Sequence, residues 1–186
     1  MFSVKNGFLG FTYSGGVDIG NVTEGISTRW KAIGKTIGVV VTNAVAGTAA
    51  TQVKTDWYES LEKPSFQPPA WVFPVAWTAL YTDIATVTGL SLADLAEKEN
   101  DEDYNSLRTA LIANAVLNFG WSFLFFTAKK PAIATVEAGA LACSSWDLAR
   151  RAMKVNRNRG LWLLPYGGWC TFATVLTGAL WWLNRD

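Results

Sequence analysis

The sequence predicts an all-α integral membrane protein, built as a compact bundle of five transmembrane helices. Half of the 186 residues are apolar, and only 17% are charged. The apolar residues are also segregated, because residues 160–184 form a run of 25 without a charge and residues 109–128 form another of 20. A helix needs about 20 such residues to cross a bilayer, so each run is long enough to span it.

The composition excludes several classes of protein and site. Sixteen basic and fifteen acidic residues leave a net charge of +1, which argues against a nucleic-acid partner and against a disordered chain. The chain has no histidine, which excludes a histidine-based catalytic triad, a histidine-ligated haem and a histidine-containing zinc site. We expect no metal and no cofactor, and we expect Cys143 and Cys170 to be buried and unpaired.

The chain begins with a stretch that differs in composition from the rest. Residues 1–31 are mixed, with paired glycines at Gly15 and Gly16, and contain no apolar core that would serve as a secretory signal. We expect this stretch to be a mobile or surface-lying N-terminal arm. Residues 32–186 then form one membrane domain.

The first two spans are expected over residues 33–53 and 70–93. Small residues recur at every fourth position of the first span, which allows another helix to approach closely: Gly34, Gly38, Thr42, Ala46 and Ala50. Residues 54–69 are expected to be a loop, extended at its end because Pro64, Pro68 and Pro69 disfavour helix. In the second span, Phe73, Trp77 and Tyr81 are spaced by four and share a face.

The remaining spans are expected over residues 107–128, 132–153 and 161–184, after an acidic aqueous loop at 97–103. One face of the third span carries Asn114, Asn118, Trp121 and Phe125, and asparagines at that depth should face protein or a cavity. The fourth span is the weakest, because it contains charged residues such as Glu137 and Asp147. Pro165, Trp169, Ala173 and Thr177 share a face of the fifth.

The distribution of basic residues predicts an orientation. With five spans, eleven of the Lys and Arg residues lie on the side of the N-terminus and five lie on the other side. The positive-inside rule then places the N-terminus in the cytoplasm if the protein resides in an inner membrane. The sequence leaves a bacterial membrane and the mitochondrial outer membrane both open, and the absence of a clear organelle address favours the bacterial one.

Four motifs occur in order along the chain: Trp57-Tyr58-x-x-Leu61-x-Lys63-Pro64-Ser65-Phe66-x-Pro68-Pro69-x-Trp71-Val72-Phe73, Val75-x-Trp77-x-x-Leu80-Tyr81, Leu117-Asn118-x-x-Trp121-x-x-x-Phe125-Phe126 and Pro165-Tyr166-x-x-Trp169-x-x-Phe172-Ala173. This order resembles the TspO/MBR family of tryptophan-rich sensory proteins and translocator proteins, also called the peripheral benzodiazepine receptor family. The resemblance covers about residues 42–184. It implies a five-helix bundle, usually a homodimer, with an interior pocket for hydrophobic ligands such as porphyrins and sterols.

The resemblance also implies which residues bind the ligand. It places nine residues at pocket or lid positions: Tyr58, Pro68, Trp77, Asn118, Trp121, Phe125, Phe126, Trp169 and Ala173. The residues themselves favour such a pocket, because aromatic and polar faces on three spans cannot all face lipid profitably. Two alternatives remain open: the rings could simply fill the core of the bundle, and Asn118 could form an interhelical hydrogen bond without a ligand.

Two departures from the family pattern affect the expected ligand. Gly178 occupies the position where the sterol motif of the family has a tyrosine, which argues against sterol binding and favours a porphyrin-like ligand. Thr177 replaces an asparagine that is usual there.

Two acids also lie within the spans. We expect Asp83, near mid-bilayer, to be protonated or bonded to Asn43 or another polar group, and Glu137 to have a structural role toward a loop.

Three classes of function are compatible with these features. The favoured one is a membrane receptor or transporter for porphyrins and related hydrophobic ligands, with a part in stress regulation. The second is an enzyme that degrades porphyrin by light- or oxygen-driven chemistry beside tryptophans such as Trp77 and Trp169. The third is a regulatory module whose ligand changes the behaviour of a partner protein.

Overall fold

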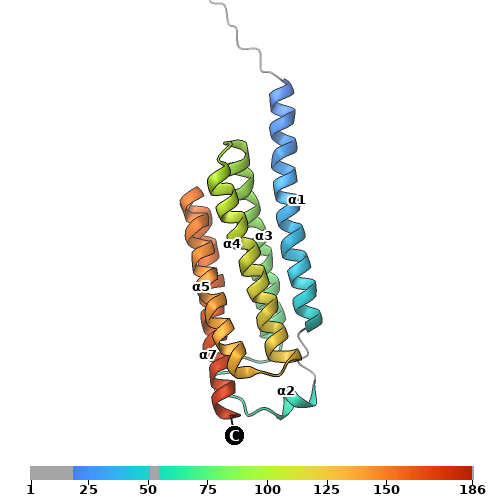
Figure 1. Cartoon of the computed structure of the whole chain (residues 1–186), viewed down its shortest axis with the longest axis vertical. Helices are drawn as coiled ribbons and strands as arrows, with labels where there is room; N and C mark the ends of the chain where they lie inside the picture. The colour runs from blue at the N-terminus through green and yellow to red at the C-terminus, as the bar shows by residue number, and fades with distance from the viewer. Residues whose placement is uncertain (1–18, 51–54, 186) are drawn as a thin grey trace, which may run out of the picture.

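A computed structural model describes residues 19–50 and 55–185, with side chains for residues 27–47 and 55–185. The described part is helical and contains no strand, which confirms the predicted all-α class. Five long helices run side by side (Figure 1): α1 (Ile19–Ala50), α3 (Val72–Glu97), α4 (Asp101–Ser122), α5 (Pro131–Val155) and α7 (Leu164–Leu183). One described helical stretch, Asp101–Thr127, is long and apolar enough by itself to cross a membrane, so the count of five spans stays a prediction.

The long helices pack as two pairs that are joined through a central helix. α1 lies along α3, and α5 lies along α7. α4 contacts α1, α3 and α5 and thereby connects the two pairs. α3 and α7 contact each other only sparsely, so the seam between them is the loosest boundary inside the bundle.

The turn between α3 and α4 is shorter than the predicted acidic loop over residues 97–103. Glu97 ends α3 and Asp101 begins α4, so only residues 98–100 lie outside helix. The side chain of Asn100 accepts a hydrogen bond from the Asp103 amide at 3.1 Å and caps α4. Three acids in the first turn interact favourably with the positive end of the helix dipole, which explains why these charged residues are helical.

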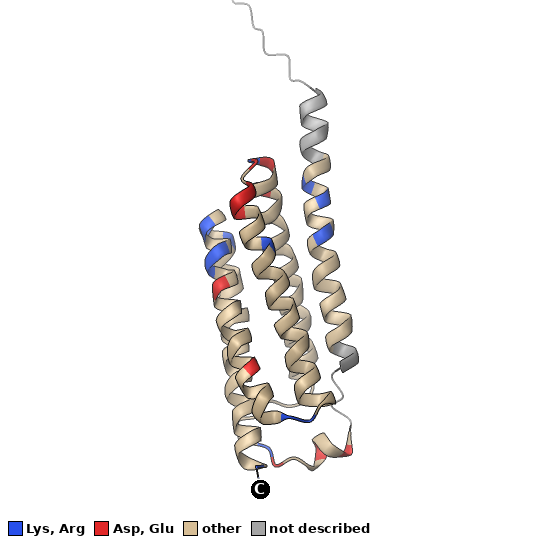
Figure 2. Cartoon of the chain, viewed as in Figure 1, with Lys and Arg blue, Asp and Glu red and all other residues tan. Residues whose placement is uncertain are grey.

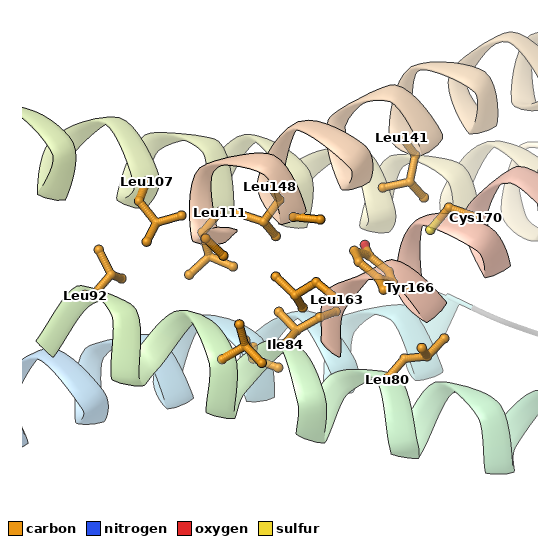
Figure 3. Packing of buried hydrophobic residues seen from close by; sticks show 14 of the residues in the cluster. Leu80, Ile84, Leu92, Leu107, Leu111, Leu141, Leu148, Leu163, Tyr166 and Cys170 are labelled. Atoms are coloured by element: carbon orange, nitrogen blue, oxygen red, sulfur yellow. The ribbon is translucent and has the colours of Figure 1, made fainter. Parts of the chain in front are cut away.

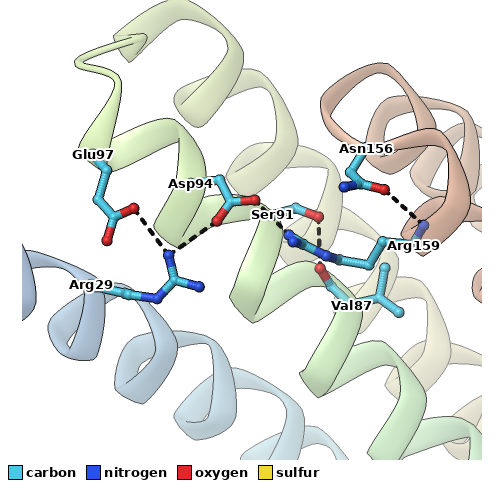
Figure 4. Close-up of polar contacts among 7 residues, drawn as sticks. All are labelled: Arg29, Val87, Ser91, Asp94, Glu97, Asn156 and Arg159. Carbon is cyan, nitrogen blue, oxygen red and sulfur yellow. Dashed lines mark hydrogen bonds and ion pairs between the residues drawn. The ribbon is translucent and has the colours of Figure 1, made fainter.

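The N-terminal boundary of the first helix also differs from the expectation. α1 begins at Ile19, so residues 19–31 of the predicted arm are helical, whereas residues 1–18 lie outside the described part. Arg29 contributes to this extension, because its guanidinium pairs with Asp94 at 3.1 Å and with Glu97 at 3.0 Å (Figure 4). Asp94 also accepts from Arg159 at 2.8 Å, so one carboxylate ties α1 and α3 to α6 (Arg157–Gly160).

Short helical pieces connect the long helices. The predicted loop over residues 54–69 contains α2 (Asp56–Ser60), which Thr55 caps by accepting from the Tyr58 amide. α4 continues into a π-helical turn, η1 (Phe123–Thr127), before Pro131 begins α5 at a position where proline is well tolerated. A 3₁₀ turn, η2 (Leu161–Leu163), leads into α7.

The core combines aliphatic side chains with one buried polar network. Leucines from α3, α4, α5 and η2 meet along the axis of the bundle (Figure 3), and Leu107, Leu148 and Leu163 are almost fully buried. The Tyr166 hydroxyl donates to Asn114 Oδ1 at 2.7 Å, and Asn114 Nδ2 donates to Ser145 Oγ at 3.1 Å. These bonds join α7, α4 and α5 where few other polar groups are available.

The charged residues and the two cysteines differ in where they lie in the bundle. Lys, Arg, Asp and Glu gather toward the two ends of the bundle, and few lie along its middle (Figure 2). Cys170 is buried and unpaired, as expected. The expectation that Cys143 is buried was wrong, because the register of α5 turns this residue outward, where its thiol is exposed.

Candidate ligand-binding site

The aromatic face of α3 points toward α4 and α7. Trp77 stacks on Tyr81 with ring centroids 5.3 Å apart, and it lies 6.5 Å from both Trp121 and Trp169. The Tyr81 hydroxyl donates to Asn118 Oδ1 at 2.7 Å. The spacing by four that the sequence shows on α3 therefore brings these rings onto one face, and that face meets the other two helices.

The face of α4 carries the centre of the ring cluster. Trp121 stacks on Phe125 at 6.1 Å and meets Phe126 edge-on at 6.0 Å. The neighbouring Phe125 and Phe126 are both buried, with centroids 4.9 Å apart, because the π-helical turn η1 changes the helical register at this point. The indole of Trp121 donates to Thr177 Oγ1 of α7 at 3.2 Å. The Thr177 hydroxyl, which stands where the family usually has an asparagine, therefore already has a hydrogen-bond partner.

α7 completes the cluster with Trp169 and Phe172, whose centroids are 5.6 Å apart. Trp169 also meets Phe73 of α3 edge-on at 6.0 Å. Its indole Nε1 is buried and has no hydrogen-bond partner. Asn118 Nδ2 is likewise buried without a partner. Two N–H donors beside the rings are thus left unsatisfied, which is costly in an apolar environment.

The loop between α1 and α3 crosses one end of the bundle (Figure 1), and its side chains contact the ring cluster. Tyr58 lies 5.5 Å from Phe126 and 6.3 Å from Phe125, measured between ring centroids. Burial raises the pKa of the Tyr58 hydroxyl above its ordinary value. Farther along the loop, Phe66 meets Phe172 edge-on at 6.4 Å.

A polar clasp holds the same loop to the end of α7. The Glu62 amide donates to Asn184 Oδ1 at 2.8 Å, and Asn184 Nδ2 donates to the Glu62 carbonyl at 2.9 Å. Lys63 Nζ lies 5.3 Å from the centre of the Tyr58 ring, and Lys129 Nζ lies 5.8 Å from that of Trp57. The loop is therefore attached both by its rings and by two hydrogen bonds between the Glu62 backbone and the Asn184 side chain.

Seven of the nine predicted site residues belong to this contact network: Tyr58, Trp77, Asn118, Trp121, Phe125, Phe126 and Trp169. Pro68 and Ala173 are half-buried, and the Ala173 carbonyl accepts from Thr177 Oγ1. The structure brings the rings together in direct contact, so a flat ligand between them requires the rings to separate.

The nine predicted site residues leave out several rings of the cluster, and two of these are Phe172 and Phe66. Phe172 follows Trp169 by three positions, and this helical spacing could have identified it. Phe66 lies in the proline-rich loop, where no periodicity exists, so its place in the first family motif is the signal that points to it.

For the two acids within the predicted spans, neither the bond between Asp83 and Asn43 nor the position of Glu137 toward a loop is observed. Asn43 donates to the Ala115 carbonyl instead of bonding Asp83, and Asp83 Oδ2 is buried without a hydrogen-bond partner. Both carboxyl oxygens of Glu137 are buried without a partner as well. Glu137 faces α4 and not a loop, because a Cβ at Gly120 would lie 3.2 Å from its Oε1. The absence of a side chain at Gly120 leaves the room that this carboxyl group occupies.

Gly178 of α7 packs closely against a neighbouring helix. A Cβ at this position would lie 3.3 Å from Thr135 Cγ2 of α5. Contact this tight leaves little room for a larger side chain, which agrees with the absence of the family's tyrosine here.

Comparison with known proteins identifies relatives of this chain. The model of the TspO/MBR family matches residues 36–183. The tryptophan-rich protein TspO of Archaeoglobus fulgidus is 37% identical over 139 residues, which cover 73% of this chain and 84% of the relative. Protein CrtK of Rhodobacter capsulatus is 34% identical, over 69% of this chain and 78% of its own. The translocator protein of Ovis aries is 29% identical, over 69% of this chain and 75% of the relative. The chain therefore belongs to the TspO/MBR family and is an integral membrane protein.

Proposed function

We propose that this protein is a receptor or transporter that binds porphyrins and other flat hydrophobic molecules among the rings of α3, α4 and α7, beneath the loop that carries Tyr58 and Pro68. The observation that carries the proposal is the ring cluster with its two unsatisfied N–H donors, Asn118 Nδ2 and Trp169 Nε1. A cluster that served only as a core would gain stability by pairing or replacing both donors.

The chemistry of these groups suits a tetrapyrrole. Its flat ring system stacks on indoles, and each aromatic pair contributes about 0.5–1.5 kcal/mol beyond the area it buries. Its carbonyl or carboxylate oxygens accept hydrogen bonds from Asn118 and Trp169. A ligand that enters the cluster thus replaces ring–ring contacts with ring–ligand contacts and removes the cost of two unpaired donors.

The loose seam between α3 and α7 supports a route for the ligand. These helices contact each other sparsely, and Trp77 and Trp169 bridge the seam at 6.5 Å. Opening the loop breaks the clasp between Glu62 and Asn184 together with a few ring contacts. Both movements leave the tightly packed pairs α1/α3 and α5/α7 intact.

The test is a titration of the purified, detergent-solubilised chain with protoporphyrin IX in the dark, followed by the shift of the Soret band. Trp169→Phe keeps an aromatic ring but removes the indole donor, so we expect a dissociation constant raised about tenfold. Asn118→Leu removes the other donor and should weaken binding by a similar factor.

Trp162→Phe is the matched control, because Trp162 is 70% exposed and lies outside the cluster. We expect it to bind porphyrin as the unaltered chain does. Absence of a saturable Soret shift in the unaltered chain would refute the proposal. Equal binding by the Trp169 and Trp162 variants would refute the assignment of the site.

A second candidate function is porphyrin breakdown, which one observation favours. Trp77 contacts both Trp121 and Trp169, so three indoles form a connected path beside the proposed ligand. Illumination of the complex in air separates the two functions. Binding alone leaves the Soret band intact, whereas breakdown bleaches it at a rate that falls in Trp77→Phe.

A further inference from the structure

A groove of about 730 Å³ runs between α1 and α4, apart from the ring cluster. Its wall is largely apolar and is formed by side chains such as Val39, Leu111 and Val116. The buried polar side chains in it are already satisfied, because Thr36 donates to the Ala32 carbonyl and Asn43 to the Ala115 carbonyl. Along most of its length the groove therefore offers only apolar contact.

Two cations line the same groove, Lys35 of α1 and Arg108 of α4. No acid of the described part lies within ion-pair distance of either one. The basic residues of α1 and α4 lie toward the same end of the bundle (Figure 2). Both cations also border apolar sequence, since Arg108 directly precedes the uncharged residues 109–128 and Lys35 is the last charge before Lys54.

This arrangement contrasts with that of other arginines in the described part. Arg29 and Arg159 pair with Asp94, and Arg150 and Arg151 pair with Asp147. An arginine at the edge of an apolar stretch is costly unless it finds a partner. A phosphate is suited to this role, because the guanidinium group can donate two parallel hydrogen bonds to it.

We propose that the groove binds one anionic glycerophospholipid, with the phosphate at Lys35 and Arg108 and an acyl chain along the small residues of α1. The lining residues Lys35 and Ala46 are separated by about 16 Å of helix, at 1.5 Å per residue. This length exceeds half of the roughly 30 Å apolar core of a bilayer, so it accommodates a chain that reaches from one headgroup layer past the midplane.

A second copy of the chain fits the groove less well than a lipid. In a symmetric dimer whose two-fold axis is parallel to the membrane normal, equivalent residues of both copies lie at the same depth. Lys35 and Arg108 would then meet the same cations across the interface and repel them. Anionic lipid removes this repulsion, and it is attracted by the basic excess on this side of the bundle.

The test is native mass spectrometry of the detergent-solubilised chain titrated with dioleoyl phosphatidylglycerol or dioleoyl phosphatidylcholine. We expect the anionic lipid to bind more tightly by on the order of tenfold, since each nearby basic residue contributes about fivefold. The double variant Lys35→Gln/Arg108→Gln should lose most of this preference. Lys31→Gln/Lys98→Gln removes the same charge outside the groove and should retain it.

A pair of glycine variants tests the apolar part of the groove. A Cβ at Gly38, which lines the groove, or at Gly34, which does not, would meet nothing within 4 Å, so both positions accept a side chain. We expect Gly38→Leu to fill the groove and to reduce lipid binding several-fold, and Gly34→Leu to leave it unchanged.

Three outcomes would overturn the proposal. These are equal binding of the two lipids, an unchanged preference in the Lys35→Gln/Arg108→Gln variant, and dissociation of a dimer by Gly38→Leu without loss of lipid. The last outcome would assign the groove to a second copy of the chain. None of these results depends on porphyrin, so the proposal stands or falls independently of the proposed function.

Discussion

The hydrogen bond from Tyr166 to Asn114 is predicted to be a main stabilising contact between α7 and α4. Tyr166 is 1% exposed and Asn114 is 3% exposed, and their side chains are joined at 2.7 Å. Tyr166→Phe keeps the ring but leaves Asn114 Oδ1 buried without this donor. A hydrogen bond between membrane helices contributes about 0.6 kcal/mol and at most about 1.7, and an orphaned buried acceptor adds to that cost. We therefore expect a loss of about 1.5 kcal/mol.

Thermal unfolding in detergent, followed by circular dichroism at one heating rate, measures this loss. A decrease of about 1.5 kcal/mol corresponds to a Tm lower by roughly 3–6 °C for a chain of this size. Tyr104→Phe is the matched control, because Tyr104 is only half-buried, and we expect its Tm to change by less than about 1 °C.

A double-mutant cycle isolates the pair itself. Asn114→Leu and Tyr166→Phe should show a coupling of about 1 kcal/mol, because either change alone already breaks the bond. Equal Tm values for the Tyr166 and Tyr104 variants, or a coupling indistinguishable from zero, would show that the network does not join the helices.

Three further changes test other contacts. Asp94→Asn weakens the pairing with both arginine partners, so we expect a loss of about 1 kcal/mol that shrinks at high salt. Gly160→Ala places a Cβ in collision with the Met153 backbone nitrogen, so we expect a Tm lowered by at least the equivalent of about 2 kcal/mol. Asn184→Ala removes the clasp on Glu62, so hydrogen exchange should become faster in residues 61–71 while it stays unchanged elsewhere.

Each of these changes has a control of the same chemistry. Asp101→Asn alters an exposed acid that forms no ion pair with an arginine of the described part, and its Tm should depend little on salt. Gly168→Ala adds a Cβ that meets nothing within 4 Å and should stabilise α7 slightly. Asn158→Ala alters an exposed asparagine and should leave exchange in the loop unchanged. If a variant and its control gave the same response, that result would contradict the contact that the variant tests.

Much of the helical layout follows from local sequence rules. Pro131 begins α5 one residue before the expected start of the fourth span at 132, because proline fits the first turn of a helix, and the double proline at 68–69 precedes α3. The rings spaced by four on α3 do share a face. These features depend on residues close together in the chain, so periodicity alone identifies them.

Other features depend on contacts between distant residues, and the sequence could not predict them. The extension of α1 over residues 19–31 involves pairing of Arg29 with residues of α3. The unpaired carboxyl group of Glu137 reflects its position opposite Gly120 on another helix. The same limit applies to the groove, because nothing in the local sequence shows that Lys35 and Arg108 line one surface.

The π-helical turn η1 has a consequence for how this protein can vary. A π turn accommodates one residue more than the α-helical turn it replaces, as the bond from the Ala128 amide to the Phe123 carbonyl shows. Deleting Leu124 would restore regular helix without disturbing the remainder of α4, yet it would rotate one of two adjacent phenylalanines out of the site. The packing of the ring cluster can thus change through chain length at a single position, with every surrounding side chain kept.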